Sequence, residues 1–336
     1  MKKSKNLENR QNKAIEEKQN LLKDIETKER LLLHPLHHHK NPLILVRNLS
    51  SCYGERQILS DVSFDIKQGD IVAICGGNGS GKSTLMKLIL GLVRKDGGEI
   101  KVFGQGVSPR NQKDLNKNLG ALIENPSFYD HLTGYENLEI ICELKGIDKA
   151  EISKTLDLVG LNNVGKKKAR DYSLGMKQRL GIAIALIGSP KLLILDEPIN
   201  GLDPQGIEEM RNLFKNIVKN TSTSILISSH ILDEMEKIST HIGILKAGKL
   251  TYNGSLEDYR KLHPPFISIQ TSDNQKAANL LDLDQVRIDG KKIILGKVSN
   301  QKISEIVNFL HGKVDIYRIE EEKESLEKLF IEESRS

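Results

Sequence analysis

The sequence predicts an α/β fold in which helices cover both faces of a mostly parallel sheet. Short, almost fully apolar runs such as 71–75 and 192–195 have the length and composition of strands that are buried on both sides. From residue 82 to about residue 250, strand-like runs alternate with stretches of helical spacing. A glycine-rich loop follows the run 71–75 and leads directly into a helical pattern. Together these observations indicate a nucleotide-binding α/β core.

Composition excludes several other classes of protein. The chain has 336 residues, of which 38% are hydrophobic, and its longest apolar runs fall far short of the ~20 residues that a membrane-spanning helix needs. No apolar stretch follows the basic N-terminus, so we expect no secretory signal and a cytoplasmic protein. The three cysteines fit neither a disulfide framework nor a zinc site. A net charge of +5 is too mild to predict nucleic-acid binding.

The chain divides into three predicted segments. Residues 1–41 form a polar, helix-prone or flexible extension that ends in a histidine-rich linker, with a partner-binding helix as the alternative. Residues 42–262 form the large domain, which begins with β-rich sequence and contains a helical subdomain at about 125–185. Residues 263–336 predict a small α/β unit with a hairpin that turns at Asp289 and Gly290 and a last helix that begins at Ser325.

The glycine-rich loop matches the pattern G-x-x-x-x-G-K-[ST] between a predicted strand and a predicted helix. Its backbone N–H groups and the helix N-terminus favour phosphate, so the fold is predicted to be a P-loop NTPase that binds ATP with Mg²⁺. We expect Lys82 at the β- and γ-phosphates, Ser83 on Mg²⁺ and Thr84 at a phosphate nearer the sugar. Chance gives the pattern in roughly one of a hundred chains of this length. The predicted nucleotide-binding residues here are Gly76, Gly77, Asn78, Gly79, Ser80, Gly81, Lys82, Ser83 and Thr84.

Two acids end the apolar run 192–195, and the carboxyl end of a parallel strand is where a nucleotide lies in such a fold. This pattern is typical of a Walker B segment. Asp196 is predicted to hold Mg²⁺ directly or through water, and Glu197 to act as the general base for the attacking water.

The stretch 172–180, Tyr-Ser-Leu-Gly-Met-Lys-Gln-Arg-Leu, resembles the signature segment of the ATP-binding-cassette (ABC) family, usually Leu-Ser-Gly-Gly-Gln. Its variant form is typical of the bacitracin- and lantibiotic-resistance branch. The resemblance implies an ABC nucleotide-binding domain with an antiparallel β subdomain and a helical subdomain. It also implies that Ser173 and Gly175 cap the γ-phosphate bound by the other protomer of a head-to-tail dimer. Leu174 and Met176 depart from the common pattern.

Other elements of the family occur in the expected order. Tyr53 resembles the aromatic residue that stacks on adenine, with a tyrosine packed inside the β subdomain as the alternative. Asp203 follows Gly201 and Leu202 in a segment that resembles the D-loop. His230 ends a predicted strand and resembles the switch-loop histidine, which would donate toward the γ-phosphate and orient Glu197 and water.

Glu124 stands where most ABC proteins carry the glutamine of the Q-loop. The resemblance places this carboxylate beside the metal, with a catalytic and metal-binding role, and in a loop that couples nucleotide state to a membrane partner. A glutamate here resembles the same antimicrobial-peptide-resistance branch, so it supports the interpretation of the signature segment independently.

The resemblance implies an ATP-hydrolysing subunit, two copies of which close around two Mg-ATP and drive a separate transmembrane permease. The cargo would be an antimicrobial peptide, and the protein would lie peripherally on the inner face of the cell membrane. A soluble ABC-type ATPase acting on the ribosome or DNA is the alternative, although the chain has neither a second cassette nor an inserted coiled coil. A GTP-binding switch is disfavoured because no Asn-Lys-x-Asp base-recognition motif follows the loop.

Overall fold

The computed structural model describes residues 42–328 except 165–166, 282–285, 297 and 327. The predicted N-terminal extension and its histidine-rich linker therefore lie outside the described residues, as does most of the helix expected from Ser325. Within the described part of the chain, no helix is long and apolar enough to cross a membrane.

A six-stranded sheet forms the centre of the large domain, in the order β10-β9-β3-β8-β7-β6. All neighbouring strands run parallel except the hairpin of β9 and β10. The predicted α/β fold is thus confirmed. The strands are β3 (Ile71–Cys75), β6 (Leu119–Leu122), β7 (Leu192–Asp196), β8 (Ser224–Ser229), β9 (His241–Lys246) and β10 (Lys249–Ser255).

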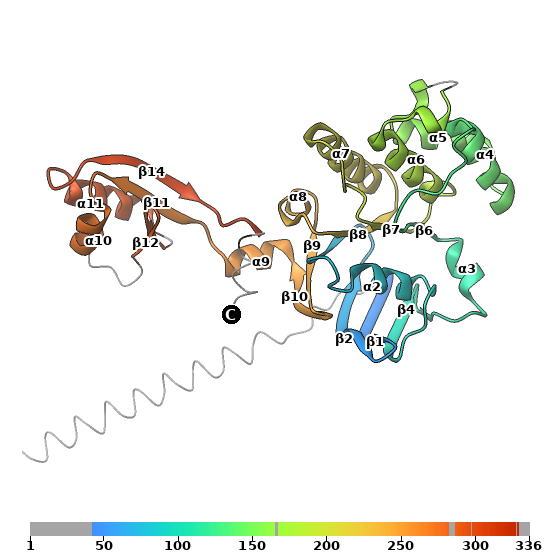
Figure 1. The fold of residues 1–336 in the computed structure, drawn as a ribbon, viewed down its shortest axis with the longest axis horizontal. Coiled ribbons are helices and arrows are strands. Elements are labelled where there is room, and N and C mark those ends of the chain that lie inside the picture. Colours follow the sequence, from blue (N-terminus) through green and yellow to red (C-terminus); the bar gives the residue numbers. More distant parts are fainter. Residues whose placement is uncertain (1–41, 165–166, 282–285, 297, 327, 329–336) are drawn as a thin grey trace, which may run out of the picture. The chain divides into compact units, whose positions relative to one another are not determined.

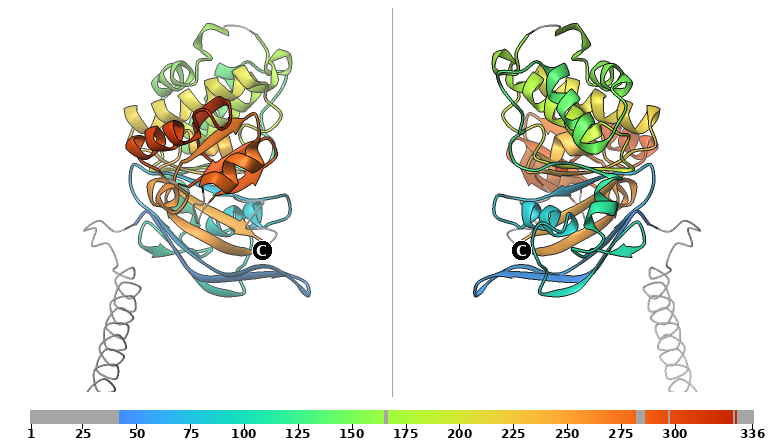
Figure 2. Two further views of the ribbon diagram at one scale, coloured as in Figure 1. Left: turned by 90° about the vertical axis from the view of Figure 1, so that its left-hand side faces the viewer. Right: turned by 90° about the vertical axis from the view of Figure 1, so that its right-hand side faces the viewer.

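Alternate side chains of each central strand enter two different cores. In β3, Ala73 and Cys75 join a cluster with the helices on one face, whereas Val72 and Ile74 join a second cluster on the other. Because both faces are covered, β3 is apolar at every position and β7 at every position before Asp196. Figures 1 and 2 show the two layers. The first face carries α4 (Gly134–Lys145), α5 (Ala150–Leu158), α6 (Leu174–Leu186) and α7 (Pro204–Asn220), and the second carries α2 (Lys82–Ile89) and the antiparallel sheet.

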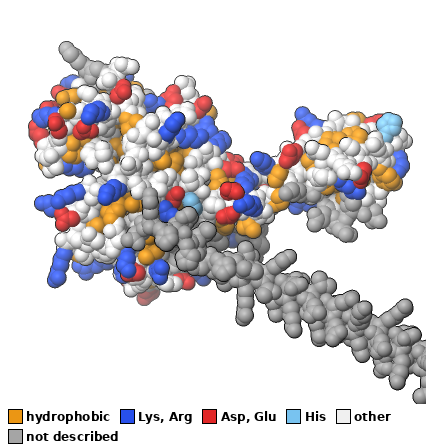
Figure 3. Space-filling view, turned by 180° about the vertical axis from the view of Figure 1, so that it is seen from behind, with side chains coloured by type: hydrophobic (Ala, Val, Ile, Leu, Met, Phe, Trp, Pro, Cys, Tyr) orange, Lys and Arg blue, Asp and Glu red, His pale blue; other side chains and the backbone are white. Residues whose placement is uncertain are grey.

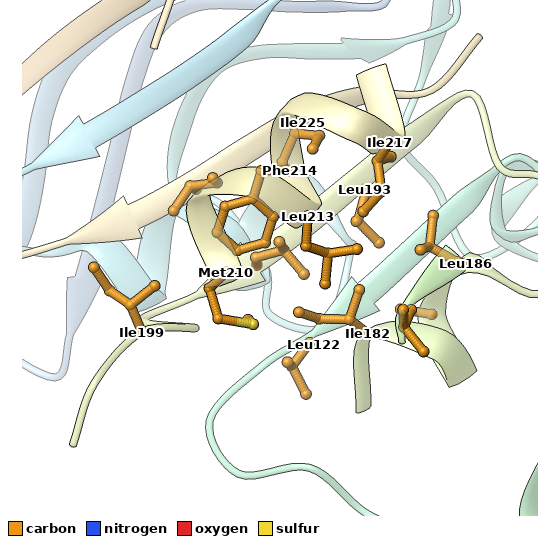
Figure 4. Packing of buried hydrophobic residues seen from close by; sticks show 14 of the residues in the cluster. Leu122, Ile182, Leu186, Leu193, Ile199, Met210, Leu213, Phe214, Ile217 and Ile225 are labelled. Atoms are coloured by element: carbon orange, nitrogen blue, oxygen red, sulfur yellow. The ribbon is translucent and has the colours of Figure 1, made fainter. Parts of the chain in front are cut away.

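Helix α7 shows how helical spacing produces this packing. Met210, Leu213, Phe214 and Ile217 recur every three or four residues and are buried against the sheet, and Figure 4 shows them gathered with Leu193 and Ile225. Burial of each such side chain stabilises the fold by about 1.5–3 kcal/mol. The helix therefore has one orientation on the sheet, and this orientation fixes the position of the loop that precedes it.

The antiparallel sheet has the order β2-β1-β4-β5. The β-rich sequence at the start of the large domain forms this sheet, and β2 is continuous from Arg56 to Ile66. Asp61 takes a left-handed φ of 55° where the register with β1 shifts, and its backbone N–H donates to Ser50 Oγ over 3.2 Å. The strand therefore contains a bulge at this residue. The strands are β1 (Ile44–Tyr53), β2 (Arg56–Ile66), β4 (Gly97–Val102) and β5 (Gln105–Gly106).

The remaining helical segments before β11 are short. They are the α-helices α3 (Gln112–Asn116), α8 (Leu232–Glu236) and α9 (Leu256–Leu262), and the 3₁₀ turns Asn162–Val164 and Ala169–Asp171.

The residues after α9 form an antiparallel sheet of order β12-β13-β11-β14 with a separate hydrophobic core. Gly290 makes the expected hairpin turn at φ 57°. Leu326, which follows β14, belongs instead to the buried cluster of the large domain, together with Tyr259 of α9. The elements are β11 (Phe266–Thr271), α10 (Asn274–Leu281), β12 (Arg287–Asp289), β13 (Lys292–Leu295), α11 (Asn300–Leu310) and β14 (Ile316–Glu322).

The surface carries charges of both signs. On the face drawn in Figure 3, basic and acidic side chains are interspersed. This distribution agrees with the small net charge of +5.

Candidate nucleotide site

Two glycines shape the loop between β3 and α2. A Cβ on Gly76 would lie 2.2 Å from the carbonyl oxygen of Leu245, so no side chain fits there. Gly81 has a φ of 109°, and a Cβ on it would lie 2.7 Å from Leu59 Cδ2. Gly81 is also the N-cap of α2 and provides no side-chain acceptor, so the first backbone N–H groups of the helix remain available to a phosphate.

The remaining loop residues divide into an exposed tip and a buried base. Gly77, Asn78 and Gly79 are exposed, and Gly79 has a φ of 76°. Ser80 is buried, and within the described residues its Oγ has no hydrogen-bond partner. A buried hydroxyl without a partner beside a narrow glycine cradle fits a polar ligand. Ser83 and Thr84 follow, half-buried, in the first turn of α2.

Lys82 is buried at the base of the loop. Its Nζ donates to the carbonyl oxygens of Gly76, over 2.8 Å, and of Gly77, over 3.1 Å, and lies 3.3 Å from Glu197 Oε1. Burial raises the pKa of Cys75 to about 12, even though the Lys82 cation acts to lower it. The Cys75 thiol therefore stays uncharged, and Glu197 is the acid that balances the lysine.

The acids at the end of β7 are held by a residue of the next strand. Asp196 is buried, and its Oδ1 accepts a 2.5 Å hydrogen bond from Ser228 Oγ. The same Ser228 oxygen accepts the backbone N–H of Glu197 over 2.9 Å. Ser228 was not predicted to take part. Its position two residues before the switch-loop histidine was the only signal in the sequence, because its contact with Asp196 follows from the pairing of β7 with β8.

Glu197 has a φ of 49°, a backbone conformation that is uncommon outside glycine and that concentrates at functional sites. His230 Nδ1 lies 2.7 Å from its Oε2, and Lys82 lies at its Oε1, so both carboxylate oxygens are positioned. A neutral His230 that donates from Nδ1 has Nε2 as an acceptor. Donation from Nε2 toward a phosphate therefore requires a doubly protonated ring.

Glu124 follows β6 with a φ of 62° and a largely exposed side chain. Its Oε1 accepts a 2.6 Å hydrogen bond from Lys87 Nζ of α2, and this bond and the lysine charge lower the pKa of Glu124. Among the described residues the carboxylate is thus paired with Lys87 and has no hydrogen bond to Ser83 or Asp196. The sequence analysis did not identify Lys87, which lies four residues after Ser83.

The signature segment and the D-loop lie together, away from the glycine-rich loop. Ser173 caps α6 by accepting from the Met176 N–H over 3.3 Å, and Asp203 caps α7 by accepting from the Gly206 N–H over 3.0 Å. Both line a hollow of about 490 Å³ that also includes Gly175 and no residue of 76–84. An ion pair between Arg179 and Glu209 joins the two helices. Within a single chain this hollow is therefore separate from the glycine-rich loop.

Tyr53 ends β1 with 85% of its surface exposed. The alternative of a tyrosine packed inside the antiparallel sheet is therefore wrong. Its ring is available to stack on a planar ligand.

Comparison with known proteins identifies the family. Residues 59–200 match the family model described as ABC transporter. The chain is 38% identical over 297 residues to the bacitracin transport ATP-binding protein BcrA of Bacillus licheniformis, an alignment that covers 86% of this chain and 96% of that protein. The chain belongs to the ABC transporter family, as an ATP-binding protein. This ABC protein is also 45% identical over 217 residues to the lantibiotic transport ATP-binding protein SrtF of Streptococcus pyogenes, covering 63% of this chain and 93% of SrtF.

Solved structures agree with the assignment of the fold. The ABC protein superimposes with a TM-score of 0.62 and 27% identity on cbiO1 from Clostridium perfringens, part of the ABC transporter complex cbiONQ, over 66% of this chain and 92% of cbiO1. The resemblance expected from the signature segment is thus confirmed. The protein is an ATPase subunit that powers transport, and such a subunit functions with a membrane permease and by dimerisation.

Proposed function

We propose that two copies of this chain bind two Mg-ATP between them and, by hydrolysing ATP, drive a separate permease that expels an antimicrobial peptide. The observation that carries the proposal is the position of Glu197, whose carboxylate is held between the Lys82 ammonium and the His230 ring at the end of β7. A fixed carboxylate at this point is suited to remove a proton from water.

The loop and Tyr53 would hold the nucleotide. Tyr53 would stack on adenine, which is consistent with its exposed ring. The loop N–H groups would bind the phosphates, and Lys82 would exchange its contacts with the loop carbonyls for contacts with the β- and γ-phosphates. The lack of space for a side chain at Gly76 and Gly81 supports this assignment, because the loop there consists of backbone alone.

Mg²⁺ would be held by Ser83 and Asp196, with Glu124 as a further ligand. Hydroxyl and carboxylate oxygens are the donors that this ion prefers, so the set fits the metal. When bound, the ion would neutralise charge on the phosphates. Ser228 supports the assignment of Asp196. Its hydroxyl holds the Oδ1 atom of the carboxylate, so Oδ2 would be the oxygen that binds the metal.

The nucleotide site of one copy would be completed by the hollow of the other. Ser173, Gly175 and Asp203 would face the γ-phosphate bound by the partner copy, with the N-terminus of α6 behind them. The separation of this hollow from the loop within one chain supports the idea, because neither part surrounds a nucleotide alone.

The names of the relatives support an antimicrobial peptide as cargo, since two of them are named for bacitracin or lantibiotic transport. They favour transport over action on the ribosome or DNA. In this proposal the chain acts on the cytoplasmic side, at the inner face of the membrane. Its helical subdomain, about residues 125–185 within the ATP-binding domain 42–262, would contact the permease, and residues 263–336 would be a small C-terminal α/β unit.

A growth assay tests the cargo. A peptide-sensitive strain that expresses this chain together with a permease that binds it should tolerate several-fold more bacitracin or lantibiotic than the same strain with the permease alone. Glu197→Gln in the same pair should remove the gain, because hydrolysis drives expulsion. Unchanged sensitivity to both peptides, or full protection by Glu197→Gln, would refute the proposed function.

A further inference from the structure

Lys87, the partner of Glu124 in an ion pair, has no role in the function proposed above. The Lys87 Nζ and the Glu124 Oε1 lie 2.6 Å apart, closer than the two atoms of the Lys82–Glu197 pair at 3.3 Å. The Lys87 side chain is 32% exposed and the Glu124 side chain 66% exposed, so water reaches both groups. A pair with this exposure is weak and can open at little cost.

The position of Lys87 on α2 relates the pair to the metal site. Residues four apart on a helix lie on the same side, one turn from each other, so Lys87 follows Ser83 along one stripe of α2. The Glu124 carboxylate contacts this side of α2 at Lys87. Ser83 and Lys87 are separated along the helix by about 5.4 Å, the rise of one turn, and a glutamate side chain can span this distance by rotation about its own bonds.

Glu124 combines a restricted backbone with a side chain that can take two positions. A φ of 62° is uncommon for glutamate and fixes where its Cα lies. The side chain beyond it is largely free. A carboxylate in this position has two possible cations, the Lys87 ammonium and Mg²⁺, whereas a neutral glutamine would form an ion pair with neither.

We propose that Lys87 is a positioning residue that holds the Glu124 carboxylate one helical turn away from the metal position, and that Mg²⁺ with nucleotide takes the carboxylate from it. The inference rests on the proposed role of Glu124 as a metal ligand and deepens it. Lys87 thereby lowers the benefit that Mg²⁺ gives to ATP binding. The competition requires a carboxylate, so it is specific to the chain with glutamate at this position.

The test measures how much Mg²⁺ strengthens ATP binding. The dissociation constant of ATP is determined by calorimetry with excess Mg²⁺ and again with EDTA, in full-length chains that carry Glu197→Gln so that ATP is not consumed. The ratio of the EDTA value to the Mg²⁺ value is the readout. The ratio is also measured in chains that carry Glu124→Gln, which report any change that does not pass through the carboxylate, such as the unequal effect of the lysine charge on free ATP and on Mg-ATP.

Lys87→Met should raise the ratio about two- to fivefold, the range that the loss of one exposed ion pair permits. It should have no effect on the ratio when Glu124→Gln is also present, and Lys87→Arg should behave as the unaltered residue does. Lys117→Met is a matched control, because Lys117 forms an exposed pair with Asp114 over 2.8 Å. It should leave the ratio unchanged.

Three results would overturn the inference. The first is a ratio that stays the same or falls with Lys87→Met. The second is a ratio that rises equally with and without Glu124→Gln, which would mean that the effect does not pass through Glu124. If Mg²⁺ does not strengthen ATP binding even with both residues intact, the proposed metal site is wrong and the inference falls with it. If the metal effect is normal and only the dependence on Lys87 is absent, this inference fails and the proposed function stands.

Discussion

Replacing Glu197 by glutamine is expected to lower the turnover rate of ATP hydrolysis by about a hundredfold or more. The amide has the shape of the carboxylate but cannot accept a proton from water, and a general base contributes about 10²–10⁴ in rate. ATP binding should persist, because the loop that binds phosphate is unchanged. Phosphate release under saturating Mg-ATP measures the turnover rate, and calorimetry measures the ATP affinity.

A surface glutamate provides the control. Glu143→Gln makes the same chemical change at an exposed residue of α4 that pairs with Lys149 over 3.0 Å, and its turnover rate should match that of the unaltered chain. Retention of full turnover by Glu197→Gln would show that another group removes the proton. Loss of ATP affinity together with turnover would instead make Glu197 a binding residue.

Replacing Lys82 by alanine is expected to weaken ATP binding by about a hundredfold or more. The ammonium would make charge-assisted hydrogen bonds to the β- and γ-phosphates, and the loss of two such bonds at about 1.5–3 kcal/mol each gives this range. Calorimetry with Mg-ATP measures the affinity.

Lys82 also holds the carbonyl oxygens of Gly76 and Gly77, so the fold of the loop must be checked separately. Lys82→Met retains most of the apolar stem, and thermal unfolding of both variants shows whether the domain is intact. Lys117→Ala removes a surface lysine as the control. A folded Lys82 variant with unaltered ATP affinity would contradict the assignment of the loop.

The parts of the site that could be predicted are those that local sequence determines. The run 71–75 is apolar at every position because both faces of its strand are buried, and the loop after it must be glycine-rich because Gly76 and Gly81 have no space for a side chain. The acids at the end of β7 were placed by the same reasoning, since the carboxyl ends of parallel strands share one edge.

The parts that could not be predicted depend on contacts between distant segments. Ser228 lies 32 residues from Asp196, and only the register of β8 against β7 brings the two side chains together. The Lys87–Glu124 pair spans 37 residues and depends on how β6 lies against α2. No local pattern carries this information, so the partner of Glu124 was missed although the glutamate itself was identified.

Two further details show where tertiary structure modified a local pattern. The β-rich sequence around Asp61 did not reveal the shift of register at that residue, where a bulge lets β2 continue along β1. Asp203 was expected to act across a dimer, and it also has a local role as the N-cap of α7. A cap is visible in sequence as aspartate followed by proline at the first helical position.

The central claim is that each nucleotide site needs the loop of one chain and the signature segment of another. The mass of the Glu197→Gln chain in solution tests it most directly, measured by light scattering with and without saturating Mg-ATP. We expect the mass of one chain without nucleotide, twice that mass with it, and a return to one chain when Ser173→Arg is added. A single-chain mass at saturating Mg-ATP would show that the nucleotide does not join two chains.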